Sequence, residues 1–113
     1  MEKIEVTFAG KKKVHAKYKN HIIKTDQEIA DGGDDSAPTP FDLFLASLAT
    51  CTGTYLKSFC EKRNIPTEGI RLLQSMSYNK EKRLIDKIDI DVMVPVDFPV
   101  KYKNAIIKSV GLC

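Results

Sequence analysis

Residues 39–64 read TPFDLFLASLATCTGTYLKSFCEKRN, and the expected architecture is built around this stretch. Thr39 can cap a helix, Pro40 suits the first helical position, and Asp42 follows Thr39 by three residues in a pattern like a capping box. Residues 43–51 are apolar or small on every side, which is typical of a helix surrounded by protein. The stretch therefore predicts one long, buried central helix that is too short to cross a membrane.

Length, charge and cysteine content limit the classes of protein that the chain can belong to. At 113 residues it has the size of one domain, so we expect a single domain over residues 1–113, helped by oligomerisation. A net charge of +3 is too small to indicate nucleic-acid binding. The charged start MEKIEVTF is unlike a signal peptide, and three cysteines without framework spacing argue against a secreted disulfide scaffold. We therefore expect a cytoplasmic protein that binds neither nucleic acid nor membrane.

Alternation of apolar and polar residues predicts strands on both sides of the central helix. Those before it form an antiparallel meander over residues 4–8, 14–18 and 22–25. Those after it are joined by a charged turn at residues 80–83 and cover residues 70–78 and 88–94. A second helix then carries an apolar stripe, which Cys113 extends, formed by Tyr102, Ala105, Ile106 and Val110. Because the chain stops one residue after Leu112, we expect the domain to be incomplete at its C-terminus.

Charged residues are sharply divided between the meander and the loop that follows it. Residues 6–25 contain six lysines and no acid, whereas residues 26–42 contain six acids and no lysine or arginine. Two interpretations remain open: two solvated surfaces of opposite sign, or a basic meander and an acidic loop that face each other, within one subunit or between two. Neither makes a phosphate site, because the loop DGGDDSAPTP is acidic and lacks the required spacing.

Cysteines are the candidate reactive groups. Cys51 lies in the middle of the long helix among small residues, which let another group approach closely. A buried thiol is most often an inert packing residue. Alternatively, Cys51 and Cys113, each on the apolar side of a helix, could meet as an attacking and a resolving thiol. Cys60 lies nine residues after Cys51, points to the opposite side of the helix, and is interpreted as a packing residue.

A reactive thiol has to be a thiolate, and burial raises its pKa unless a cation compensates. The candidate cations are Lys17 or Lys19 on the second strand and Arg71 on the fourth. Asp42 lies nine residues before Cys51, about 13 Å along the helix axis, and is interpreted as a cap rather than a contact of the thiol.

No metal site or cofactor is expected. His15 and His21 lie on short neighbouring strands, far from any cysteine pattern, and the sequence has no CxxC or other zinc-ligand spacing. Both histidines are therefore interpreted as structural or surface residues.

The segment GGDDSAPTPFDLFLASLATCTG resembles the signature of the OsmC/Ohr family, named for osmotically inducible protein C and organic hydroperoxide resistance. It has a Gly/Asp-rich loop, a proline-led helix start, an acid and a mid-helix cysteine, and the order of elements matches along nearly the whole chain. The similarity is greatest to the OsmC-like branch. This resemblance implies an α+β fold and an intertwined homodimer, in which the two meanders join into one sheet and the thiol sites form at the subunit interface.

The resemblance also implies thiol peroxidase chemistry. Cys51 would be oxidised to a sulfenic acid by an organic hydroperoxide, Cys113 would resolve it as a disulfide, and a dithiol reductant would restore both. Asp42, Lys17 and Arg71 are the supporting candidates.

The chain departs from the hydroperoxide-resistance branch in three ways. Phe41 stands where a glutamate follows the proline, lysines at residues 11–13 stand where an arginine is expected, and the final strand after the second cysteine is missing. The first two departures favour a rival function, in which a non-catalytic dimer binds an apolar small molecule in the interface cavity.

Overall fold

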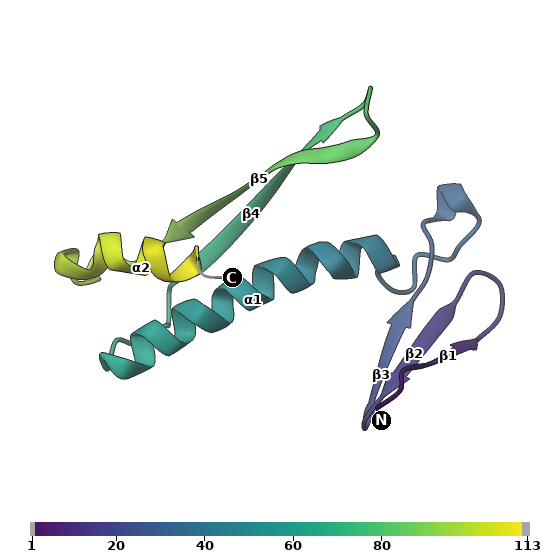
Figure 1. Ribbon diagram of the computed structural model, residues 1–113, viewed down its shortest axis with the longest axis horizontal. Coiled ribbons are helices and arrows are strands. Elements are labelled where there is room, and N and C mark those ends of the chain that lie inside the picture. Colours follow the sequence, from purple (N-terminus) through teal and green to yellow (C-terminus); the bar gives the residue numbers. More distant parts are fainter. Residues whose placement is uncertain (1, 112–113) are drawn as a thin grey trace. The chain divides into compact units, whose positions relative to one another are not determined.

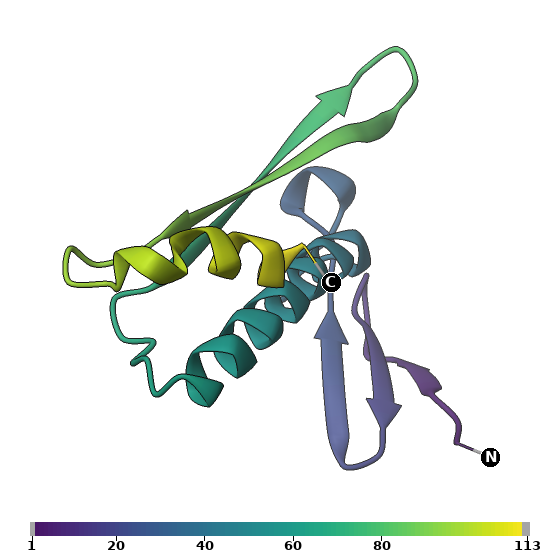
Figure 2. The ribbon, with the colours of Figure 1, turned by 60° about the vertical axis from the view of Figure 1, so that its left-hand side comes forward.

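The computed structural model of the protein describes residues 2–111. These residues group into two compact units, Met1–Ser47 and Leu48–Cys113. The elements follow the order predicted from the sequence, so the α+β assignment is confirmed (Figures 1 and 2). They are β1 (Glu5–Phe8), β2 (Val14–Tyr18), β3 (His21–Thr25), η1 (Ile29–Asp31), α1 (Pro40–Lys62), β4 (Arg71–Asn79), β5 (Leu84–Met93), η2 (Val100–Tyr102) and α2 (Lys103–Val110). The boundary between the units falls inside α1, which belongs in part to each. The prediction of a single domain over residues 1–113 therefore stays a prediction.

A three-stranded antiparallel sheet in the order β1-β2-β3 forms most of the first unit, as the alternating pattern predicts. Glu5 of β1 pairs with Lys17 of β2, and Val14 of β2 pairs with Thr25 of β3. The prediction that Lys19 lies on the second strand is wrong. Lys19 has a φ of 55° and belongs to the tight turn between β2 and β3.

The loop after β3 is organised around Asp26, whose side chain has no exposed surface. This carboxylate accepts hydrogen bonds from the backbone N–H of Gln27 at 2.8 Å and of Ser36 at 3.1 Å. It also accepts the Ser36 hydroxyl at 2.6 Å and the Asp34 N–H at 3.3 Å. The Ser36 hydroxyl, followed by these N–H groups, holds the pKa of Asp26 well below its usual range, because all of them favour the charged form.

Glycine is required at residue 33 of this loop. A Cβ atom there would lie 2.0 Å from the carbonyl oxygen of Gln27, which is closer than any non-bonded contact allows. The Gly/Asp-rich composition of the loop therefore follows from its tight folding around one carboxylate rather than from flexibility.

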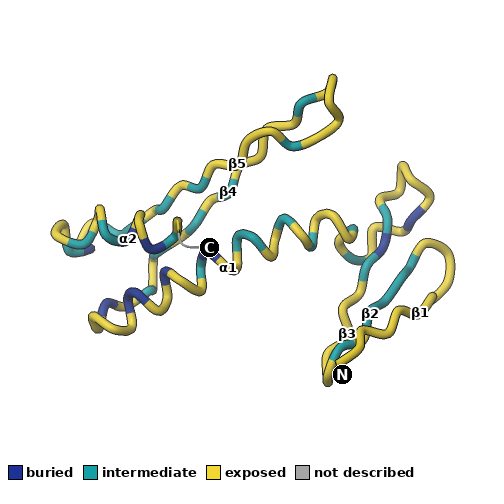
Figure 3. The backbone as a smooth tube through the Cα atoms, in the orientation of Figure 1, coloured by how far each residue is buried: buried dark blue, intermediate teal, exposed yellow. Residues whose placement is uncertain are grey.

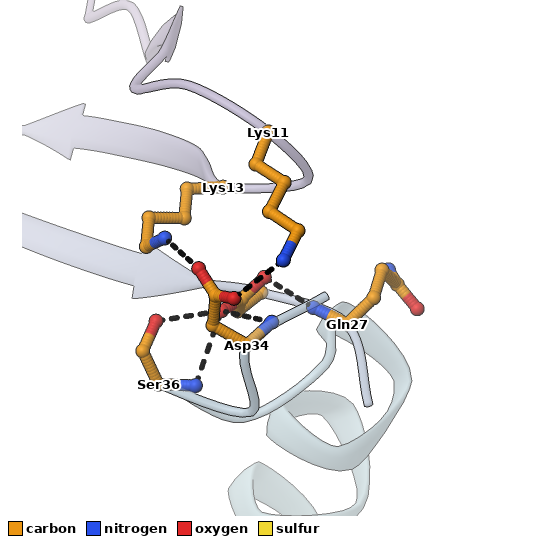
Figure 4. A network of polar contacts seen from close by, with 6 residues as sticks. Lys11, Lys13, Gln27, Asp34 and Ser36 are labelled. Carbon is orange, nitrogen blue, oxygen red and sulfur yellow. Dashed lines mark hydrogen bonds and ion pairs between the residues drawn. The ribbon is translucent and has the colours of Figure 1, made fainter. Parts of the chain in front are cut away.

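The basic meander and the acidic loop face each other within one subunit. Lys11 and Lys13, from the turn between β1 and β2, each reach a different carboxylate oxygen of Asp34 at 2.6 Å (Figure 4). The two lysines lower the pKa of Asp34. Both pairs are largely exposed, so they orient the loop more than they stabilise the fold.

Replacing Asp26 with asparagine should remove a pH dependence of stability. The folded-state pKa of Asp26 lies below that of the unfolded chain, so its ionised form stabilises the fold above the unfolded pKa. That contribution is lost as the pH falls through the folded pKa. We expect D26N to have a lower free energy of unfolding than wild type at neutral pH and to lose less on acidification, measured by urea unfolding at several pH values. Asp31→Asn, at an exposed acid of the same loop, is the control and should follow the wild-type profile.

The start of α1 agrees with its predicted cap. The backbone N–H of Asp42 donates to the Thr39 hydroxyl oxygen at 3.1 Å, which satisfies one of the free N–H groups of the first turn. Near its other end, α1 contributes to the core of the second unit.

The second unit packs the β4-β5 hairpin and α2 with the C-terminal half of α1. The hairpin is antiparallel, with Leu72 opposite Val92 and an irregularity at Ser77/Tyr78, and residues 80–83 form its turn as predicted. The predicted apolar stripe is confirmed for Ala105, Ile106 and Val110 of α2 and for Tyr102, which lies in η2, since all four pack in or against the core; its extension to Cys113 lies outside the described residues. The buried core consists of Leu56, Phe59, Cys60, Ile65, Phe98 and Ile106.

The prediction that α1 is buried on every side does not hold for the single chain. Its buried residues are confined to the C-terminal half, as Figure 3 shows, and are Thr52, Leu56, Phe59 and Cys60. Nearer its start, Phe44 remains 57% exposed. An all-round apolar helix needs cover on every side, and the second unit supplies it on one side only. The homodimer, which would cover more of the helix, stays a prediction. Within the described residues, no helix combines the length and apolar character needed to cross a membrane.

Candidate functional site

Cys51 lies midway along α1 and its side chain is exposed in the single chain, whereas the sequence predicted a buried thiol. The reason is again that the core of the second unit covers only the opposite side of the helix. Cys51 is disulfide-bonded. Cys113, the predicted resolving cysteine, lies outside the described residues, so its role stays a prediction.

Cys60 differs from Cys51 in exposure and in bonding, and its interpretation as a packing residue agrees with its burial. It is a free thiol with no exposed surface in the core of the second unit. Burial raises its pKa, and the positive charges of Lys57 and Arg63 offset this only in part. Cys60 is therefore held as a neutral thiol, which suits packing and not nucleophilic attack.

The supporting residues predicted from the sequence occupy separate elements. Asp42 is exposed in the first turn of α1, and Lys17 is exposed on β2; both belong to the first unit. Arg71 is exposed at the first position of β4, in the second unit. Their roles toward Cys51 stay predictions.

One side of α1 borders an apolar cavity of about 460 Å³. At about 100° per residue, the residues of α1 that line it point away from the side that carries Cys51. The lining consists of Ala49, Thr50, Gly53 and Leu56 from α1 with Thr67, Ile70 and Leu72 from the segment that leads into β4. This space is an open, mainly apolar hollow of a volume that could hold a small molecule against one side of α1.

The other side of α1 borders a second hollow, of about 440 Å³, that sequence reasoning missed. Tyr55, Ser58 and Lys62 follow Cys51 at spacings of four, seven and eleven residues, so these four side chains fall on one stripe of the helix. The hollow is lined by Tyr55, Ser58, Phe59, Lys62, Arg63 and Ser109. The signal for it in the sequence is the Lys62-Arg63 pair at the end of the long helix.

Arg63 is fixed at the edge of this hollow. Its guanidinium carbon lies 3.7 Å from the ring centroid of Phe59 and 5.7 Å from that of Tyr102. One guanidinium N–H also donates to the carbonyl oxygen of Phe59 at 3.0 Å, which caps the end of α1. The two rings meet edge to face, with centroids 6.0 Å apart. The charge of Arg63 is therefore held in place by packing.

Metal binding has no visible basis in the part of the chain that the structure describes. No group of three or more histidine, cysteine or acidic side chains comes together among residues 2–111.

The fold and the site define a small α+β protein with an exposed cysteine midway along its central helix. The sequence profile of OsmC-like proteins matches residues 33–113, well over half of the chain, and the chain belongs to this family.

Among solved structures, the chain is similar to a proposed osmotic stress induced and detoxification response protein from Psychrobacter arcticus. The two share 21% sequence identity with a TM-score of 0.80, over 97% of this chain and 82% of the other. At this identity, the likeness shows the fold. A comparison with curated protein sequences finds no match.

Proposed function

We propose that the protein is a thiol peroxidase that reduces organic hydroperoxides, with Cys51 as the attacking thiol and Cys113 as the resolving thiol. The observation that carries the proposal is the contrast between two cysteines of one helix. Cys51 is exposed and disulfide-bonded, whereas Cys60 is buried and free. The first has the access that peroxide chemistry needs, and the second does not.

The proposed reaction has three steps. The Cys51 thiolate attacks the outer oxygen of the hydroperoxide and the O–O bond breaks, so that oxygen with its hydrogen passes to sulfur as a sulfenic acid, and the alkoxide takes a proton from water and leaves as the alcohol. The Cys113 thiol then attacks the Cys51 sulfur, which forms the disulfide and releases water. A dithiol reductant finally exchanges with that disulfide, is itself oxidised to a disulfide, and returns both cysteines to thiols.

Disulfide mapping tests this proposal. We expect the reduced protein, treated with one equivalent of cumene hydroperoxide, to yield a peptide that links Cys51 to Cys113, while Cys60 remains alkylatable after unfolding. Mass spectrometry of the alkylated digest measures both. A digest in which Cys51 stays alkylatable after the peroxide is consumed, or in which Cys51 is linked to Cys60, would contradict the mechanism.

Association into a homodimer is part of the proposal. Exposed apolar side chains in each unit support it, among them Phe8 at 82% and Phe44 at 57% in the first, and Val100 at 77% and Ile107 at 58% in the second. Surfaces with this much apolar area are typical of protein interfaces. A dimer would give the thiol the enclosed surroundings that the single chain does not supply.

A second candidate function is non-catalytic binding of an apolar small molecule. The cavity of about 460 Å³ beside Ala49, Gly53 and Leu72 favours it, because its lining is mainly apolar. Placed within one unit, this cavity differs from the interface cavity that the family resemblance implies. A protein that leaves cumene hydroperoxide unreacted but binds an apolar dye, with binding lost in Gly53→Leu, would have this function instead.

A further inference from the structure

We propose that the hollow at the C-terminal end of α1 is a binding site for an oxyanion, a carboxylate or phosphate group carried on a small apolar body. The lining of this hollow does not include Cys51, although Tyr55, Ser58 and Lys62 lie on the same stripe of α1 as that cysteine. Three features of the lining carry the inference: its charge, its fixed arginine and its aromatic wall.

The charge of the lining has one sign. Lys62 and Arg63 contribute two cations, and the six lining residues include no carboxylate. Within residues 2–111 neither cation takes part in an ion pair, since the pairs formed there use Lys11, Lys13, Lys57 and Lys87. Two cations without a carboxylate partner among the described residues attract an anion to this hollow, although Arg63 also offsets the partial negative charge at the end of α1 through its hydrogen bond to the Phe59 carbonyl.

Arg63 is prepared for an oxyanion before any ligand arrives. Its packing on Phe59 and its hydrogen bond to the Phe59 carbonyl fix the plane of the guanidinium, so little side-chain entropy is lost on binding. That hydrogen bond uses one of five N–H donors. Within residues 2–111 the others make no hydrogen bond to protein, so they can form the paired hydrogen bonds that carboxylate and phosphate oxygens accept from arginine.

Hydroxyl groups and an aromatic ring complete the site. Tyr55 and Ser58 precede Lys62 on the same stripe of α1 and can donate to a bound oxygen. Ser109 of α2 closes the other side, although its own proton is used in a 2.7 Å hydrogen bond to the Ile106 carbonyl. Tyr55, which is 42% exposed, supplies an apolar wall, because Phe59 is buried beneath Arg63; this wall suits a ligand with a small hydrocarbon or aromatic body next to its acid group.

Paired ligands that differ in charge test the proposal. We expect benzoate and phenyl phosphate to bind the wild-type protein saturably, and benzamide to bind at least about tenfold more weakly. Isothermal titration measures the affinities. Nuclear magnetic resonance should show chemical-shift changes centred on Tyr55 and Phe59. Added NaCl should lower the affinity for both anions. Binding by only one of the two anions identifies its acid group as the natural one.

Charge-neutral substitutions locate the binding. We expect Arg63→Gln to lower the affinity for both anions by about tenfold or more, and Lys62→Gln to lower it by a smaller factor. Arg63 also caps α1, so R63Q could unfold. The Lys62 variant then keeps the test valid, because it alters only an exposed side chain. Lys57→Gln is the matched control, since it removes an equal charge from α1 outside the lining. Equal loss in K57Q and K62Q, equal affinity for benzamide and benzoate, or no saturable binding would overturn the proposal.

Discussion

Replacing Cys51 with serine is expected to lower the rate of cumene hydroperoxide reduction by at least about a thousandfold, to the background of dithiothreitol alone. The hydroxyl of serine stays protonated at neutral pH and does not accept an oxygen atom from a peroxide as a thiolate does. The rate is measured as hydroperoxide consumed in the presence of the dithiol.

The control for this variant is Cys60→Ala, which removes the other thiol of α1. Cys60 is sealed in the core and far around the helix from Cys51, so C60A should keep the wild-type rate once it is folded. Circular dichroism confirms that both variants fold. Full activity in folded C51S, or the loss of activity in C60A alone, would rule out the assignment of Cys51.

Replacing Ile106 with alanine should lower the free energy of unfolding by about 3 kcal/mol, because it removes three buried carbon atoms and leaves a cavity. Ile106 is 2% exposed and lies in the core of the second unit with Leu56 and Phe98. Urea unfolding, followed by circular dichroism, measures the change.

The neighbouring residue provides a matched control. Ile107 is 58% exposed, so Ile107→Ala should change the free energy of unfolding by less than about 1 kcal/mol. Equal losses at residues 106 and 107 would mean that the observed helix face is not the one that packs in solution.

Sequence reasoning recovered the order of the elements because each has a strong local signal. Thr39 and Pro40 mark where α1 begins, and the alternation of residues 88–94 marks a strand without knowledge of its partner. Helix geometry also showed that Cys60 and Cys51 point to opposite sides, since nine residues separate them, but not that the core lies on the side of Cys60. These are short-range properties of the chain, and they survive in the structure.

What sequence reasoning missed depends on contacts between residues far apart in the chain. Asp26 was counted only as one of six acids, because nothing local shows that Ser36 folds back onto it. The ion pairs of Lys11 and Lys13 with Asp34 join residues more than twenty positions apart. The sequence therefore could not decide whether the basic meander and the acidic loop contact each other. The exposed state of Cys51 was missed for a related reason: an apolar pattern reveals that a helix needs cover but not which element supplies it.

Because Cys60 has no exposed surface, its reactivity can serve as a probe of how often the second unit opens. A thiol reagent can modify it only during the moments when the surrounding side chains part. In a variant that lacks Cys51, and with the reagent in excess, the labelling rate of Cys60 therefore measures the rate at which this core opens under native conditions. Any ligand that stabilises the unit should lower the labelling rate of Cys60, whatever chemistry the ligand takes part in.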